Sequence, residues 1–127
     1  MTISHSAALA NPTIADVNAL FKTFADPTRL RVLSLLAAGE LCVCDIVEIL
    51  ELPQPTVSRH LAILREAGLV NVTREWKFAY YRLAEPSHPV HRNLINCVRS
   101  CFRGIASLDR ERMRAEKRVS ARETDPC

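Results

Sequence analysis

The chain has 127 residues, of which 48% are hydrophobic, and a formal net charge of +3 at pH 7. This length suits one domain with one modest core. The sequence has no apolar run of roughly 18 residues, so we expect no membrane span. The first ten residues lack a basic flank and a long apolar core, which argues against a secretory signal and favours a cytoplasmic protein.

The N-terminal half predicts two helices in succession. Residues 14–25 place apolar side chains at helical spacing, namely Val17, Leu20, Phe21 and Phe24. Asp26 followed by Pro27 is typical of a helix cap with proline at the first helical position. We therefore predict a second helix over residues 28–38, ended by Gly39 because glycine readily adopts left-handed dihedrals.

Two further helices are predicted on either side of a short turn at residues 51–53. The third helix, over residues 41–50, is expected to bury Ile46, Ile49 and Leu50. The fourth tolerates Pro55 in its first turn, ends at Gly68, and carries a buried stripe of Val57, Leu61 and Leu64. Two helices joined by such a turn form a helix-turn-helix motif.

Residues 69–83 change to an alternating pattern rich in Val and Tyr, which predicts a two-stranded hairpin. Its tip falls near Arg74 and Lys77. That tip has no Asn-Gly or Asp-Gly pair, so we expect a loop longer than two residues.

A last helix is predicted after the break at residues 86–89. It carries a continuous apolar stripe and is a candidate for pairing with a second subunit: Val90, Leu94, Cys97, Val98, Cys101, Ile105 and Leu108. Residues 109–127 contain six basic and five acidic residues, and we expect a charged, flexible tail unless they extend the helix. The predicted fold is mainly α: a dimeric winged helix-turn-helix domain over residues 1–108, with about five helices and a two-stranded wing.

The polar start of the fourth helix points to nucleic acid. In a winged helix-turn-helix this helix enters the major groove, with its first residues at the base edges. Glutamine can pair with adenine, arginine with guanine, and hydroxyls with bases or phosphates. A solvated surface is the alternative, but the helix, the terminating glycine and the hairpin agree on DNA binding. The predicted DNA-contacting residues are Gln54, Thr56, Ser58, Arg59 and His60 in the helix, and Arg74 and Lys77 in the wing.

The segments 24–33, 40–46, 54–69 and 80–83 are similar to the ArsR/SmtB family of metal-responsive repressors. The most specific of them is Glu40-Leu-Cys-Val-Cys-Asp45, which resembles arsenite and antimonite sensors and also cadmium and lead sensors. The similarity spans about residues 17–108. It implies a homodimer on an inverted-repeat operator that leaves a resistance promoter when arsenite or antimonite binds its cysteine thiolates.

Cys42 and Cys44 are the main candidate ligands. On a regular helix, residues two apart point about 200° away from each other. We therefore expect the first turn of the third helix to unwind before both sulfurs hold one ion, which would disturb the DNA-reading helix. A helix N-terminus also favours the thiolate that binds soft metals. Both residues could instead be small buried hydrophobic side chains.

The sequence does not determine which other residues bind the ion. Some arsenic sensors of this type have a third cysteine where this chain has Val47, and cadmium sensors add N-terminal cysteines that residues 1–41 here lack. Cys97 and Cys101, four residues apart on one helical face, are an alternative or additional site, and Cys127 could supply a third thiolate. Subunit-interface packing is the ordinary explanation for Cys97 and Cys101.

Other functions are also considered. The five cysteines are an odd number, which argues against a disulfide framework and leaves room for a repressor that senses thiol oxidation or another soft metal, such as cadmium or lead. His88 and His91 resemble zinc ligands near the last helix of related repressors, but we expect them on the surface. An enzyme is disfavoured, since no cysteine pairs with a plausible base and no phosphate-binding glycine loop is present.

Overall fold

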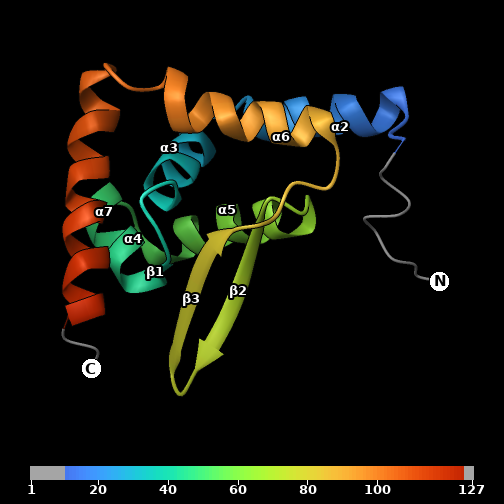
Figure 1. Cartoon of the computed structure of the whole chain (residues 1–127). Helices are drawn as coiled ribbons and strands as arrows, with labels where there is room; N and C mark the ends of the chain where they lie inside the picture. The colour runs from blue at the N-terminus through green and yellow to red at the C-terminus, as the bar shows by residue number, and fades with distance from the viewer. Residues whose placement is uncertain (1–10, 125–127) are drawn as a thin grey trace.

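The structure is a computed structural model and describes residues 11–124. The elements in order are α2 (Ile14–Phe24), α3 (Pro27–Leu36), β1 (Leu41–Cys42), α4 (Val43–Leu50), α5 (Gln54–Glu66), β2 (Val70–Glu75), β3 (Phe78–Leu83), α6 (Pro89–Asn96), the π-helical turn η1 (Cys97–Cys101) and α7 (Ala106–Thr124). Figure 1 shows the β2–β3 hairpin extending from the helices as a wing. The predicted winged helix-turn-helix fold is confirmed. Within residues 11–124, no helix is both long and apolar enough to cross a membrane.

The core lies where α3, α4 and α5 meet. The predicted stripes of α4 and α5 are buried, and α3 adds fully buried aliphatic side chains: Val32, Leu33, Leu35, Ile46, Val57, Leu61 and Leu64. Burial of each such side chain contributes about 1.5–3 kcal/mol. This packing fixes α5 against α4 and leaves the opposite side of α5 facing outward.

The turn between α4 and α5 is tight. Glu51 ends α4 in the left-handed region with φ 56°, and its N–H donates to the carbonyl of Val47. Pro53 then precedes α5 in an extended conformation and has no side-chain capping hydrogen bond. In the first turn of α5, the N–H groups of Thr56 and Val57 both donate to the carbonyl of Pro53, and Pro55 has no N–H.

The sheet has a third strand that the sequence did not predict. Its order is β1-β3-β2, with Leu41 opposite Tyr81 and Cys42 opposite Tyr80. The helix predicted to start near Leu41 begins two residues later, at Val43, because Leu41 and Cys42 are extended. Cys42 is the N-cap of α4, and its Sγ accepts a hydrogen bond from the N–H of Asp45 at 3.4 Å.

The turn of the wing contains only Trp76 and Lys77, since Glu75 pairs directly with Phe78. The expectation of a longer loop was wrong. Trp76 itself adopts a left-handed φ of 58°, so the two-residue turn forms without glycine. Lys77 Nζ lies 4.9 Å from the centre of the exposed Trp76 ring.

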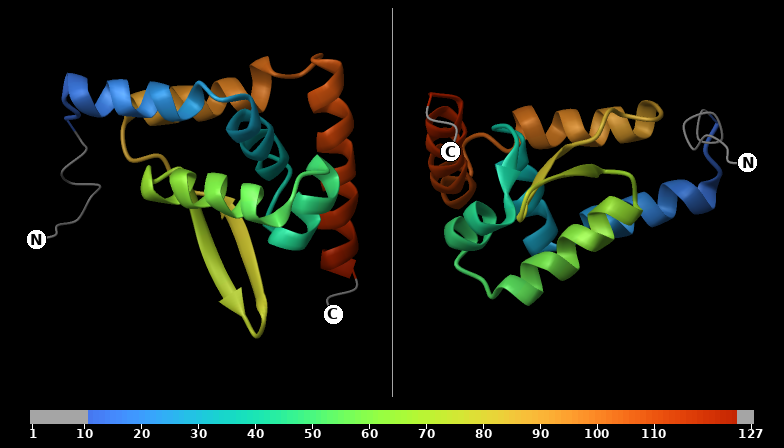
Figure 2. Two further views of the ribbon diagram at one scale, coloured as in Figure 1. Left: turned by 180° about the vertical axis from the view of Figure 1, so that it is seen from behind. Right: turned by 90° about the horizontal axis from the view of Figure 1, so that it is seen from below.

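The predicted last helix is divided in two. After α6 and η1 the chain turns at Gly104, where φ is 95°, and α7 runs back along α3 and α4 (Figures 1 and 2). Gly39 permits this approach, because a Cβ at that position would lie 3.0 Å from the Val119 side chain. The segment 109–124, expected to be a flexible tail, is therefore helical and packed, with Ala115 fully buried.

His88 and His91 also differ from the surface location expected. His88 is the N-cap of α6, and its Nδ1 accepts a hydrogen bond from the N–H of His91 at 3.3 Å. The Nδ1 of His91 accepts from the N–H of Ser87 at 3.2 Å. Both histidines are buried because their rings accept backbone hydrogen bonds at the start of α6 instead of facing solvent.

Candidate metal centre and nucleic-acid interface

The outward side of α5 presents most of the polar residues predicted to read DNA. Gln54, Ser58 and Arg59 are exposed and Thr56 is half-buried. They point away from the core because Val57, Leu61 and Leu64 hold the other face of the helix. Arg74 and Lys77 are exposed at the end of the wing. These six residues are accessible to a nucleic acid, and their contact with it stays a prediction.

His60 does not belong to this surface. It is 8% exposed, and its Nδ1 lies 3.2 Å from Arg29 Nη1 and 3.9 Å from the carboxylate of Asp26. Burial is the main cause that lowers the pKa of His60, so the neutral ring is favoured. Its position on the helix turns it toward the start of α3, which corrects its prediction as a base-reading residue.

Cys42 and Cys44 meet without any change to α4. The structure joins them as a disulfide, with Cα atoms 5.4 Å apart. Cys42 is buried and Cys44 is exposed. The expected 200° divergence, and with it the need to unwind the helix, was wrong: Cys42 lies outside the helix as its extended N-cap, so its sulfur turns toward that of Cys44. The odd number of cysteines argued against a framework of disulfides, and this single disulfide was not expected.

Asp45 is a third potential donor that the sequence reasoning missed. One ligand atom each from Cys42, Cys44 and Asp45 lie within 4.8 Å of one another, and this is the one group of three such donors found among residues 11–124. A cluster of two soft sulfurs fits a thiophilic ion once the disulfide is reduced. The order Cys-x-Cys-Asp at a helix start was the available signal.

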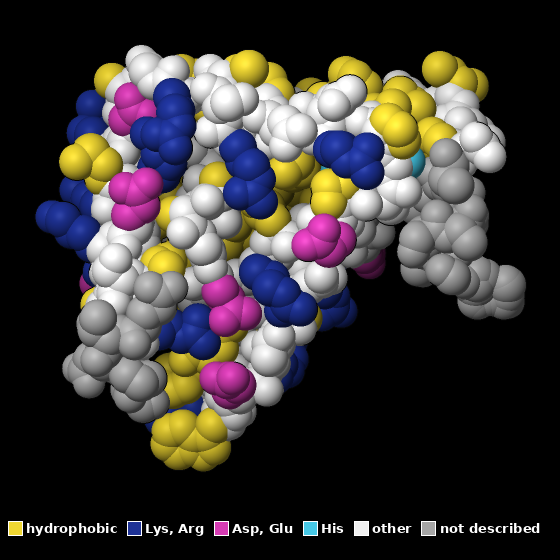
Figure 3. All heavy atoms as spheres, viewed as in Figure 1, with side chains coloured by type: hydrophobic (Ala, Val, Ile, Leu, Met, Phe, Trp, Pro, Cys, Tyr) yellow, Lys and Arg dark blue, Asp and Glu magenta, His cyan; other side chains and the backbone are white. Residues whose placement is uncertain are grey.

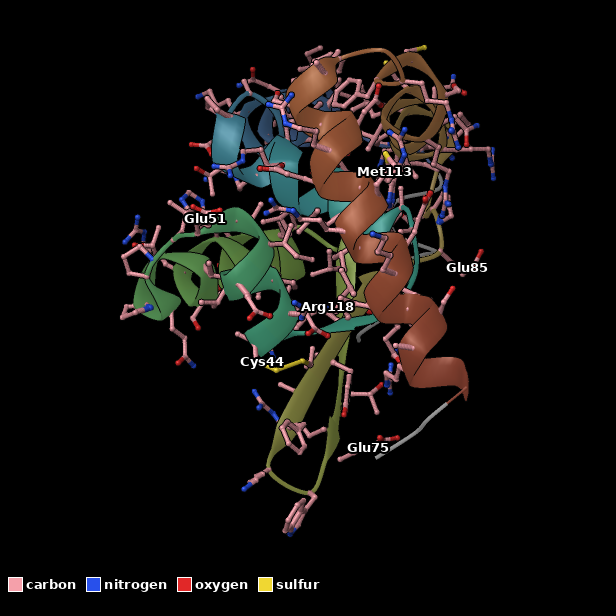
Figure 4. The ribbon with its side chains drawn as sticks, turned by 90° about the vertical axis from the view of Figure 1, so that its left-hand side faces the viewer. Cys44, Glu51, Glu75, Glu85, Met113 and Arg118 are labelled. Carbon is pink, nitrogen blue, oxygen red and sulfur yellow. A yellow bond between two sulfur atoms is a disulfide. The ribbon has the colours of Figure 1, made fainter. Side chains whose placement is uncertain are left out.

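Asp45 is already engaged by the C-terminal helix. Its Oδ1 accepts from Arg118 Nη1 at 2.5 Å, and the second nitrogen of Arg118 lies 2.5 Å from Glu48. The hydrogen bond to Glu48, followed by that to Asp45, raises the pKa of Arg118 above its ordinary value. In Figure 4, Arg118 of α7 lies beside α4, in the same region as Cys44 and the base of the wing.

One cleft of about 620 Å³ is lined both by the two cysteines and by residues predicted to contact DNA. Its walls come from the start of α4, from one side of α5 and from the wing: Cys42, Val43, Cys44, Val47, Gln54, Ser58, Ala62, Arg65, Arg74, Lys77, Phe78, Ala79 and Tyr81. Four predicted DNA-contacting residues therefore share a cleft with both predicted ligands. Arg65 also lines the cleft but was not among the predicted site residues, although its spacing from Gln54 and Ser58 places it on the same helical face.

Cys97 and Cys101 lie elsewhere, in the π-helical turn η1. Both are free thiols, and the hydrogen bond that the Cys97 thiol makes to Cys101 is the main cause that raises the pKa of Cys97. A raised thiol pKa disfavours the thiolate that binds metals. Neither Cys97 nor Cys101 lines the cleft. Cys127 lies outside the described residues.

Comparison with known proteins identifies the family of the chain. Residues 26–72 match the model of the family described as "Bacterial regulatory protein, arsR family". The chain is 42% identical over 93 residues to the arsenic resistance transcriptional regulator ArsR1 of Pseudomonas putida, covering 72% of this chain and 67% of that protein. It is 52% identical over 66 residues to the arsenical resistance operon repressor of Escherichia coli, covering 51% and 56%. It is 40% identical over 76 residues to a homolog of the cadmium resistance regulatory protein CadC from Staphylococcus aureus, covering 59% and 63%.

Solved structures show the same fold. Reduced HlyU from Vibrio cholerae has a TM-score of 0.63 and 32% identity, over 71% of this chain and 92% of that one. The homodimeric winged helix-turn-helix domain of Mb0332 from Mycobacterium bovis has a TM-score of 0.61 and 31% identity, over 80% and 87%. The chain belongs to the arsR family of bacterial regulatory proteins and is a DNA-binding transcriptional regulator.

Proposed function

We propose that this chain is a cytoplasmic, homodimeric repressor that occupies an inverted-repeat operator and is released when Cys42 and Cys44 bind arsenite or antimonite. The observation that carries the proposal is the cleft that both cysteines share with Gln54, Ser58 and the wing. The similarity to arsenic resistance regulators supports the choice of inducer.

The shared cleft suggests how release occurs. Gln54 and Ser58 contact base edges, while Arg74 and Lys77 neutralise phosphates on the same side of the molecule. The two thiolates hold the inducer between these elements, in space that the bound operator requires. Occupation of the cleft therefore competes with DNA, and α4 keeps its regular helix throughout.

The dimer is supported by an apolar surface on α2. Ile14 is 85% exposed and Phe21 is 51% exposed, although both are large hydrophobic residues. Figure 3 shows hydrophobic side chains gathered over the end of the structure where α2 lies. A second copy covering this face would give a dimer with two α5 helices, which operator half-sites about 34 Å apart require.

The test is a fluorescence anisotropy titration of an operator fragment with the reduced protein. Arsenite or antimonite should release the wild type, whereas a Cys42→Ser/Cys44→Ser protein should bind the operator equally well and stay bound. Cadmium, lead and zinc are titrated in parallel. A Cys97→Ser/Cys101→Ser protein is the matched control, and loss of release in this control alone would move the site to η1.

A second candidate function is favoured by the disulfide between Cys42 and Cys44. Its formation from two thiols releases two electrons and two protons to an oxidant such as a peroxide. The same cleft would then report thiol oxidation. Release of the reduced repressor by peroxide without any metalloid, lost in the Cys42→Ser/Cys44→Ser protein, would favour this function.

A further inference from the structure

The candidate site offers two sulfurs and no third soft ligand among the described residues. Val47 stands one helical turn after Cys44 and lines the same cleft, so the place nearest to a third thiolate on α4 holds an aliphatic side chain. Asp45 is the third donor of the cluster, but its carboxylate is held by Arg118. The site is therefore built as a dithiol.

A dithiol does not suit every form of trivalent arsenic equally. Inorganic arsenite has three exchangeable oxygen ligands, so two thiolates leave one hydroxyl on the arsenic and one ligand position without sulfur. An arsenical with one organic substituent keeps its carbon–arsenic bond and exchanges only two ligands. Two thiolates complete its coordination, with both sulfurs supplied by one preorganised pair.

The cleft has room for an organic substituent. Its volume is about 620 Å³, whereas a cavity of roughly 150 Å³ is enough to hold benzene. Val47, Phe78 and Ala79 supply apolar lining beside the thiols. Burial of a hydrocarbon group against these side chains adds to the free energy of binding.

We propose that the thiol site of Cys42 and Cys44 selects trivalent arsenicals carrying one organic substituent over inorganic arsenite, which rests on the repressor function proposed above. The two thiols displace two hydroxyl groups from the arsenic, two sulfur–arsenic bonds form, and two waters leave. The arsenic stays trivalent, so this step needs no oxidant or reductant. The disulfide is first reduced with two electrons and two protons from two molecules of a low-molecular-weight thiol, which together form one disulfide.

The experiment compares phenylarsine oxide with sodium arsenite on the reduced full-length protein. Operator release is followed by fluorescence anisotropy, and adduct formation is followed by intact-protein mass spectrometry without DNA. Phenylarsine oxide should act at a concentration about tenfold or more below that of arsenite, a difference of about 1.4 kcal/mol. Val47→Cys should lower the arsenite concentration needed by about tenfold, and the matched control Val47→Ser should not.

The outcomes separate this inference from the proposed function. Equal potency of the two compounds, or greater potency of arsenite, overturns the selectivity and leaves the repressor function standing. Release by phenylarsine oxide that persists in the Cys42→Ser/Cys44→Ser protein overturns the site. Failure of both compounds to release DNA overturns this inference together with the arsenic-responsive function. If Val47→Cys no longer binds the operator, the wild-type comparison alone decides.

Discussion

At the scale of single residues, Cys42 and Arg118 determine what the thiol site can do. Cys42 caps α4 from an extended position, so its sulfur reaches Cys44 while the helix stays intact. Arg118 holds Asp45 by an ion pair and leaves the sulfurs as the free donors of the cluster. The Arg118 side chain is 39% exposed, so the pair adds only about 0.2–1 kcal/mol of stability. Its main effect on the site is to occupy the Asp45 carboxylate, so that the two sulfurs are the ligands left for an ion.

His91 gives a prediction about pH. The residue is 2% exposed, and burial is the main cause that lowers its pKa. A lowered folded-state pKa means that the unfolded chain binds the proton more tightly, so stability is full above about pH 6.5 and falls as the pH drops below it. We expect the melting temperature of the wild type to fall from pH 7.5 to pH 5.5, and to fall less for His91→Gln. An equal fall in both proteins would contradict this account.

At the scale of elements, ion pairs hold α7 against α4, the helix that carries the thiols. Arg114, Arg118 and Arg122 follow one another at intervals of four and so share one helical face. They pair with acidic residues of α4, β2 and the segment before β1, namely Glu51, Asp45, Glu48, Glu75 and Glu40. Arg122 also lies 3.7 Å from the centre of the Tyr80 ring. The helix therefore connects α4 to the wing.

The packing of α7 can be tested with two substitutions on that helix. Ala115 is fully buried, whereas Met113 is 58% exposed. Ala115→Glu places an unpaired charge in the contact and should lower the free energy of unfolding by roughly 3 kcal/mol. Met113→Glu should change it by at most about 0.5 kcal/mol. Urea denaturation followed by circular dichroism measures both, and equal values would show that α7 does not pack as described.

Some features of these elements could be predicted from the sequence, and others could not. The stripes of α4 and α5 were predictable because Ile46, Val57 and Leu61 repeat with the helical period. The docking of α7 was not, since Arg118 meets Asp45 across 73 positions of sequence and no local pattern reveals such a partner. The start of α4 was missed because the extended state of Cys42 depends on its pairing with Tyr80 in β3. That pairing also decides the geometry of the thiol site.

At the scale of the whole molecule, the exposed face of α2 and the outward side of α5 are two separate surfaces. Ile14 and Phe21 are exposed on α2, where the proposed function places a second copy, and the exposed polar residues of α5 are those it places against DNA. Single-site affinity is modest for such a small reading surface, and two linked half-site contacts raise it strongly. Dimerisation and operator binding should therefore be lost together.

Phe21→Glu tests this coupling. A charge on the apolar face should convert the dimer to a monomer in sedimentation velocity and weaken operator binding by about 100-fold or more, in keeping with the loss of avidity. Ala19→Glu is the control, because residue 19 is exposed on the other side of α2. A dimeric Phe21→Glu protein with unchanged operator affinity would place the dimer interface elsewhere.

The central claim is that the thiols and the operator share one cleft, and cysteine protection tests it most directly. The reduced protein is treated with iodoacetamide, free and bound to saturating operator, and the modification of each cysteine is followed by peptide mass spectrometry. Cys44 is exposed in the described chain, and we expect bound operator to slow its alkylation about tenfold or more, in line with tight occupancy. Cys101, exposed in η1, should react at the same rate in both samples. Equal rates at Cys44 with and without operator would contradict the claim.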